Sequence, residues 1–188
     1  MEKSLQGQFL IATCGLRDSH FFKTAVLIVE HGKDGAMGLV INRPSSVTVS
    51  NALGGQFDLP DIDDLVYVGG PVEPAALFVL HGDPNLCGEE SPVVPGLFIA
   101  TNAEVFEEVL SAVAEGDHNF PCRLYSGCAG WAPGQLEGEI DRGDWLALPA
   151  SPELVFHDDP YAVWDNLLQA AYRSHRLLPD ECDHPEWN

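Results

Sequence analysis

The sequence contains very few basic residues. Nine Lys and Arg stand against 29 Asp and Glu, which gives a formal net charge of −20, and the span from Pro44 to Cys122 contains no Lys or Arg. Nucleic-acid binding needs clustered cations beside the phosphates, and nine scattered ones cannot form a basic groove in this field. We therefore expect neither direct nucleic-acid binding nor attraction to an anionic membrane. The acidity is equally compatible with a simple role in solubility.

Long apolar runs and paired cysteines are also missing. No run approaches the roughly 18–20 apolar residues that span a bilayer, and the N-terminus lacks the apolar core and cleavage site of a secretory signal. An odd number of cysteines without a C-x-x-C pair predicts reduced thiols, as in a cytoplasmic protein, and no disulfide framework. These cysteines are Cys14, Cys87, Cys122, Cys128 and Cys182.

The common chemical motifs are absent. The chain has no P-loop, no dinucleotide fingerprint after a strand, and no G-x-S-x-G nucleophile motif. Cys182-Asp183-His184 lacks a second ligand pair, and the acidic stretch 61–64 lacks the glycine and distal glutamate of a calcium loop. We therefore expect no cofactor, no metal site and no complete set of catalytic residues.

The order of the predicted elements favours an α+β fold. Strands dominate the first half of the chain and helices the second, which is typical of a mostly antiparallel or mixed sheet with flanking helices. No linker or repeat divides the chain, so we expect one domain over residues 1–188, with a loose tail at about 179–188. The predicted strands are Phe9–Ala12, Ala25–Glu30, Ala36–Asn42, Leu65–Val68, Leu77–His81, Gly96–Ala100, Cys122–Tyr125 and Trp145–Leu148. The predicted helices are Ser46–Gly55, Thr101–Gly116 with a capping box from Thr101 to Glu104, Pro133–Gly143 and Asp159–Arg173.

The predicted hairpin around Gly32–Gly35 has polar residues at its strand ends. Its apolar, β-branched strands indicate burial on both faces. Glu30 and His31 end the first strand, whereas Asn42 and Arg43 end the second, before a proline that cannot continue a ladder. His31 is either a general base or ligand, or the cap of a hydrogen-bond network. Arg43 either clamps a carboxylate or phosphate, or pairs with Glu30.

Glycine-rich segments follow later in the chain. Gly69-Gly70-Pro71 predicts a sharp turn, and Gly127 to Gly130 predicts a second turn with open backbone N–H groups. Pro133 suits the first position of a helix, which would place Gln135 and Glu137 in its first turn and Trp131 at its entry. This arrangement is either an anion site or a packed turn with self-capping acids. Cys128 is a nucleophile only if His31 or His81 lies beside it, and otherwise a small buried thiol.

Five segments taken together identify a family. Glu30-His31, Gly35–Pro44, Tyr67–Val72, Leu80-His81 and Gly127–Glu137 resemble the AlgH/YqgE-like family of bacterial proteins, in order from about residue 7 to 164. The resemblance implies a single α/β-sandwich-like domain whose bifurcated sheet curls into a pseudo-barrel. It supplies no reaction, only a regulatory label from a role ascribed in alginate production. Cys14 and Ser19 depart from the family, whose members often have proline there.

The sequence therefore predicts a non-enzymatic regulatory or interaction protein that acts through a protein or small-molecule partner. The alternatives are an enzyme of unknown reaction that uses Glu30, His31 and Arg43, with or without Cys128, and a set of motifs that only stabilise the fold. Convergence of the motif residues on one open cleft would favour a binding site. The expected partner surface comprises Glu30, His31, Asn42, Arg43, Gly69, Gly70, Pro71, Gly127, Gly130, Trp131, Gln135 and Glu137.

Overall fold

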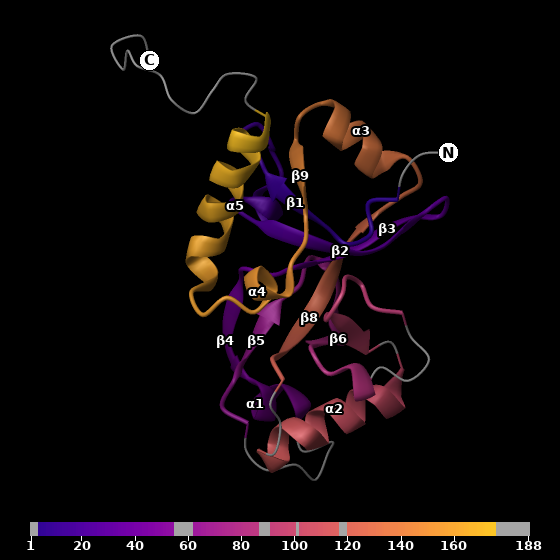
Figure 1. Ribbon diagram of the computed structural model, residues 1–188, viewed down its shortest axis with the longest axis vertical. Helices are drawn as coiled ribbons and strands as arrows, with labels where there is room; N and C mark the ends of the chain where they lie inside the picture. Colours follow the sequence, from indigo (N-terminus) through magenta and orange to yellow (C-terminus); the bar gives the residue numbers. More distant parts are fainter. Residues whose placement is uncertain (1–3, 55–61, 87–90, 101, 117–119, 176–188) are drawn as a thin grey trace.

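The computed structural model describes residues 4–54, 62–86, 91–100, 102–116 and 120–175 (Figure 1). It confirms the α+β class. The strands are β1 (Gln8–Ala12), β2 (Ala25–Gly32), β3 (Gly35–Val40), β4 (Pro44–Thr48), β5 (Leu65–Val68), β6 (Val72–His81), β7 (Phe98–Ala100), β8 (Cys122–Trp131) and β9 (Trp145–Pro149). The helices are α1 (Val49–Leu53), α2 (Ala103–Glu115), α3 (Gln135–Asp141), α4 (Pro152–Val155) and α5 (Pro160–His175), with 3-10 turns at Ser19–Phe21 and Pro84–Leu86.

The strands form one mixed sheet that branches. Its path runs β4-β5-β8-β3-β2-β1-β9, and β6 with β7 leaves this path at β8. The pairing of β5 with β8 is parallel, and the other strand pairings are antiparallel. The sheet does not close, because within the described residues β4 and β9 end the path without pairing to each other. The mixed sheet with flanking helices is as the sequence predicted.

β8 belongs to both halves of the branched sheet. Its residues up to Cys128 pair with β5 and β6, and its last three residues pair with β3 through Ala36↔Trp131 and Gly38↔Ala129. The predicted strand over Cys122–Tyr125 is therefore only the beginning of a ten-residue strand. The prediction of a turn between Gly127 and Gly130 is wrong, since both glycines lie within β8.

The close approach of two backbone segments explains the glycines. A Cβ atom on Gly69 would lie 2.2 Å from the carbonyl oxygen of Gly127, and one on Gly70 would lie 2.3 Å from the backbone of Cys128. Gly127 has φ +67 and faces the carbonyl of Gly70 in the same way. At Gly69, Gly70 and Gly127 the segment after β5 thus crosses the middle of β8 so closely that any side chain would collide with backbone. We call these three residues the glycine crossing.

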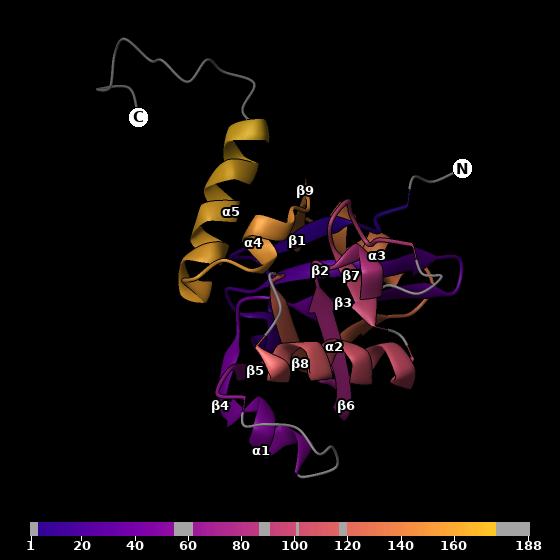
Figure 2. The same cartoon turned by 60° about the horizontal axis from the view of Figure 1, so that its bottom comes forward.

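The β2–β3 hairpin is buried on both faces, as predicted. On one face, Leu27 and Val29 pack in a cluster with residues of α5, and on the other, Val26 and Ile28 pack with Trp131 and residues of α3. A third cluster lies under α1 and α2, against the β5–β6–β8 branch, and Figure 2 shows α2 crossing that branch. In the described parts of the chain, no helix is long and apolar enough to cross a membrane.

Several predicted element boundaries are corrected. α2 begins at Ala103, and its N-cap is Asn102, whose side chain accepts a hydrogen bond from the Val105 amide at 2.9 Å. The capping box from Thr101 is therefore wrong, and Thr101 itself lies outside the described residues. The predicted helix over 46–55 begins later, because β4 starts at Pro44 and runs to Thr48. The predicted tail at 179–188 lies outside the described residues.

The glycine crossing can be tested by adding a single methyl group. Gly69→Ala places a Cβ against the Gly127 carbonyl, and the backbones must separate, so we expect a loss of about 3 kcal/mol in the free energy of unfolding. Gly32→Ala is the matched control, because a Cβ there meets open space. Urea denaturation of the two variants measures the difference. Equal stability of both would show that the crossing tolerates side chains.

Candidate functional site

Four of the predicted site residues belong to the hairpin, two at its tip and two at its base. His31 pairs with Ala36 beside the turn, and Glu30 pairs with Met37. The strands are antiparallel, so the end of β3 lies at the opposite end of the hairpin, roughly 20 Å from the tip. Asn42 and Arg43 follow that end. The structure therefore does not bring Arg43 to Glu30, and the predicted pairing between them is wrong.

His31 connects three segments at the tip. Its Nδ1 accepts a hydrogen bond from the Leu5 backbone N–H at 3.1 Å, and its Nε2 lies 2.7 Å from Glu137 Oε1. Because Nδ1 acts as an acceptor, the proton of a neutral imidazole sits on Nε2 and is donated to Glu137. The His31 side chain is 8% exposed and that of Glu137 is 32% exposed. The hydrogen-bond network predicted as one role for His31 is present.

Glu137 lies in the first turn of α3 and is held in its charged form. Its pKa is lowered from the ordinary value, chiefly by a hydrogen bond with its own backbone N–H; burial opposes this effect, and the hydrogen bond and charge of His31 each lower the pKa by a smaller amount. α3 has no side-chain cap at its N-terminus, where Gly134 adopts φ 74. Pro133 therefore lies before the helix. The sequence had placed it at the first helical position, and that prediction is wrong.

Two surface hollows flank His31. One, of about 480 Å³, is lined on the hairpin side by Glu30, Asp34 and Met37 and on the β8 side by Trp131. The other, of about 470 Å³, is lined by Ser4, Lys33, Gly134 and Glu137. Glu30 and Asp34 are exposed and form no ion pair within the described residues. The hairpin tip thus offers a concave surface with two exposed carboxylates.

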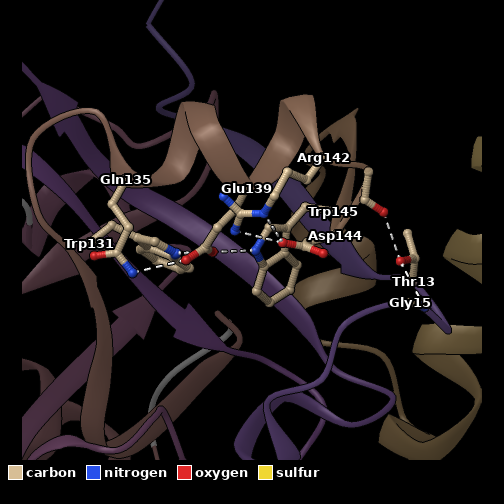
Figure 3. Close-up of polar contacts among 9 residues, drawn as sticks. Thr13, Gly15, Trp131, Gln135, Glu139, Arg142, Asp144 and Trp145 are labelled. Atoms are coloured by element: carbon tan, nitrogen blue, oxygen red, sulfur yellow. Dashed lines mark hydrogen bonds and ion pairs between the residues drawn. The ribbon is translucent and has the colours of Figure 1, made fainter.

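Glu139 is a residue of α3 whose side chain connects the helix to two strands beneath it (Figure 3). It was not among the site residues predicted from the sequence. Its Oε2 accepts hydrogen bonds from the indole N–H groups of Trp131 at 2.9 Å and Trp145 at 2.8 Å, and its Oε1 accepts one from Gln135 Nε2 at 2.9 Å. Both indoles are buried, and the Phe21 ring packs against them. The indoles come from two different strands, so no local spacing could reveal this network.

Gln135 has a structural role of the same kind. Its Oε1 accepts a hydrogen bond from the Ala132 amide at 3.1 Å while its Nε2 donates to Glu139. These contacts resemble the packed turn with capping side chains that the sequence allowed, and they occupy the backbone N–H of Ala132, which an anion would otherwise have used. Beyond this network, Arg142 and Asp144 form an exposed ion pair at 2.8 Å (Figure 3).

Asn42 and Arg43 bind backbone at the base of the hairpin. Asn42 accepts a hydrogen bond from the Ala25 amide and donates one to the Lys23 carbonyl, each at 2.9 Å. Arg43 donates to the carbonyls of His20 at 2.7 Å and Phe22 at 3.3 Å. Both side chains therefore position the segment before β2. The remaining predicted site residues, Gly69, Gly70, Pro71, Gly127 and Gly130, lie at or beside the glycine crossing and line neither hollow at the tip.

Cys128 is separated from both histidines that could have activated it. It packs in the cluster on the α5 face of the sheet, whereas His31 contacts α3 on the other face. Strand spacing places the Cα atoms of Cys128 and His31 roughly 14 Å apart. His81 pairs with Cys122, six residues earlier on β8 and thus roughly 20 Å from Cys128. Burial, with the nearby Glu73, raises the pKa of the Cys128 thiol, which is unlike an activated nucleophile.

A further cavity, of about 280 Å³, lies between α1, α2 and the branch of the sheet. Asp64 and Arg123 are charged residues in its lining, and Cys122 is its thiol. Burial raises the pKa of Cys122 to about 12, so this thiol is also protonated at neutral pH. Across the described residues there is no group of three or more His, Cys, Asp or Glu side chains that could hold a metal ion. The predicted weak candidate Cys182-Asp183-His184 lies outside them.

Comparison with known proteins places the chain among bacterial relatives. A family model described as AlgH-like matches residues 9–175. A UPF0301 protein of Ralstonia pickettii is 41% identical over 96% of this chain and 95% of its own, and one of Chromobacterium violaceum is 42% identical over 84% of each. The solution structure of AlgH from Pseudomonas aeruginosa matches with a TM-score of 0.71 and 35% identity, over 98% of this chain and 100% of that one. A crystal structure of a Corynebacterium diphtheriae protein matches with a TM-score of 0.71 and 25% identity, over 90% and 88%.

Removal of the Glu139 carboxylate should destabilise the protein. Glu139→Ala leaves two buried indole N–H groups without this acceptor, so we expect a loss of about 3 kcal/mol in the free energy of unfolding. Glu139→Gln keeps one amide oxygen for the indoles but places its own NH₂ group against the NH₂ group of Gln135. We expect this variant to lose about 1 kcal/mol in the free energy of unfolding. Urea denaturation gives both values, and the indole N–H resonances report the local change. Asp141→Ala, at an exposed position of the same helix, is the control; a loss as large there would mean that α3 is sensitive to any lost carboxylate.

The lowered pKa of Glu137, due first to its own backbone N–H and to a smaller extent to His31, should make stability depend on pH. The folded-state pKa of Glu137 is below the ordinary 4.5, so its contribution is fully present above that value and is lost as pH falls through the folded pKa. Since Glu137 is about one-third exposed, we expect only about 1 kcal/mol. Unfolding midpoints of the wild type and Glu137→Gln, measured from neutral to acid pH, should converge on acidification. Parallel curves, matching those of the surface control Glu107→Gln, would contradict the assignment.

Proposed function

The chain belongs to the AlgH-like family, and from this premise we propose that it is a non-enzymatic interaction protein whose partner binds at the hairpin tip. The partner is a protein segment or small molecule that carries a cationic group. One observation carries this proposal: His31 lines both hollows at the tip and is held there by Glu137, a residue 106 positions away in the chain. If His31 and Glu137 paired with each other away from any hollow, the hairpin tip would offer no place for a partner.

The chemistry of the tip favours a cation. His31 has both ring nitrogens in hydrogen bonds, so it holds the tip together and is not available to accept a proton from a ligand. Glu30 and Asp34 supply exposed carboxylates in the same hollow as Trp131. Exposed carboxylates that have no ion-pair partner within the described residues suit an ammonium or guanidinium group. The acidic chain as a whole would also steer such a ligand toward the surface.

Catalysis has less support. An enzyme using Glu30, His31 and Arg43 needs these groups in one pocket, within hydrogen-bond reach of a reacting atom. Here Arg43 lies at the other end of the hairpin, and Cys128 faces the other side of the sheet. No nucleophile with an adjacent base therefore occurs among these residues.

The cellular context is part of the proposal. We infer a cytoplasmic protein with reduced cysteines, and any regulatory role would run through proteins or metabolites. The charge of −20 supports this inference, because it opposes direct contact with DNA. A gel shift at physiological salt that detects tight, sequence-selective DNA binding would overturn it.

The binding site can be tested with cationic probes of known composition. We expect spermidine and a short oligoarginine peptide to shift the amide resonances of residues 30–37. Glu30→Lys should weaken binding about tenfold through charge repulsion in the hollow. Glu107→Lys is the matched control, since it makes the same change in net charge at an exposed position on α2. If both variants lose affinity equally, the probes sense only net charge, and if an oligoglutamate peptide shifts the same resonances, the assigned ligand class is wrong.

A further inference from the structure

The loop before β2 exposes an aromatic side chain in a fixed position. Phe22 is 72% exposed, although the neighbouring Phe21 turns inward and packs on the rings of Trp131 and Trp145. Tyr161, near the start of α5, is 74% exposed. Phe22 and Tyr161 line one hollow of about 260 Å³ at the base of the hairpin. Exposed aromatics that flank a hollow are typical of protein interaction sites.

Two motif side chains hold this loop with hydrogen bonds to its backbone. Arg43 donates to the carbonyls of His20 and Phe22, and Asn42 donates to that of Lys23. Lys23 adopts φ 52, a left-handed conformation that costs a non-glycine residue on the order of 1 kcal/mol or more. The chain keeps this strained residue because Asn42 and Arg43 fix the segments on either side of it. The strain and the hydrogen bonds together orient Phe22 toward solvent.

The hollow also has a local excess of positive charge. Lys23 and Arg43 line it together with Asp165. The Lys23 ammonium lies 5.0 Å from the centre of the Trp164 ring, and Arg43 contacts neutral carbonyls. Within the described residues neither cation forms an ion pair. In a chain of net charge −20, two cations without carboxylate partners beside exposed aromatics favour a negatively charged ligand at this place.

We propose that the Phe22–Tyr161 face, formed by Phe22, Lys23, Arg43, Tyr161, Trp164 and Asp165, docks an acidic peptide segment that carries an aromatic anchor. The anchor side chain packs between the two exposed aromatics, and the peptide carboxylates pair with Lys23, while the positive charge of Arg43, which is held by two carbonyls, adds to the attraction. A second copy of this chain is a poorer occupant, because two chains of charge −20 repel each other. This face is separate from the hairpin tip, and the proposal does not depend on the partner proposed there.

Fluorescence anisotropy with a labelled synthetic peptide tests the proposal. The peptide carries one phenylalanine between pairs of glutamates, in a glycine and serine background. Phe22→Ser and Tyr161→Ser should each weaken its binding about tenfold, because aromatic anchors dominate such contacts. Tyr172→Ser is the matched control: this tyrosine lies on the same helix and is 51% exposed but does not line the hollow. The Tyr172→Ser variant should bind the peptide with the affinity of the wild type.

The position of the loop is tested separately with Asn42→Ala. Asn42 also lines the hollow, but its amide oxygen and nitrogen are both bound to backbone, so the change removes the acceptor of the Ala25 amide and the donor to the Lys23 carbonyl and leaves the exposed aromatics in place. We expect faster hydrogen exchange at Ala25 and weaker peptide binding, while the far end of the hairpin keeps its exchange rates. Unchanged affinity with faster exchange would show that the loop needs no such positioning, which would overturn that part of the proposal.

Other outcomes would overturn the assignment of the partner. A matched peptide with lysines in place of the glutamates should bind about tenfold more weakly; equal binding, lost again in Phe22→Ser, would mean that the charge preference is wrong. No detectable binding of the acidic peptide would refute the proposal. Sedimentation that reveals a dimer, abolished by Phe22→Ser, would instead make a second copy the occupant.

Discussion

The close crossing of Gly69, Gly70 and Gly127 is the constraint on which the rest of the structure depends. The Gly69 amide donates to the Ser126 carbonyl, and its own carbonyl accepts from Val40, both at 2.8 Å, so one residue connects β8 and β3 through backbone alone. Because no side chain intervenes, β8 can leave the β5–β6 branch and continue beside β3. That continuation carries Trp131 and α3 to the hairpin tip, and without it His31 and Glu137 could not meet.

α3 itself depends on carboxylates. A seven-residue helix whose N-cap is a glycine without a side-chain cap is too short to be stable alone. Glu137 fixes its first turn to His31, and Glu139 fixes its middle to the indoles of Trp131 and Trp145. These two acids are therefore not part of the exposed negative surface. Their carboxylates form specific contacts between the helix and the three strands β2, β8 and β9.

The parts of the fold predicted from sequence were those with local signals. The hairpin, the strand at 65–68 and the long C-terminal helix have clear apolar patterns, and the family motifs supported the branched sheet. The glycines from Gly127 to Gly130 were misassigned because a glycine needed for close backbone approach has the same local pattern as one needed for a turn. The bonding of Glu139 to Trp145 could not be predicted either, since it depends on how β8 and β9 lie across the sheet.

The geometry of the hairpin also separates motif residues that are adjacent in the sequence pattern. Since β2 and β3 are antiparallel, Glu30-His31 and Asn42-Arg43 lie at opposite ends, and each pair contains residues bound into the fold. His31, Asn42 and Arg43 hold backbone segments or neighbouring elements, whereas Glu30 and, just before β2, Phe22 remain exposed beside a hollow. A side chain already satisfied by the fold gains little from a ligand, and an exposed one that its neighbours hold in place gains most. The binding surfaces of this fold are therefore to be sought in the exposed residues that the motifs position, more than in the polar motif residues themselves.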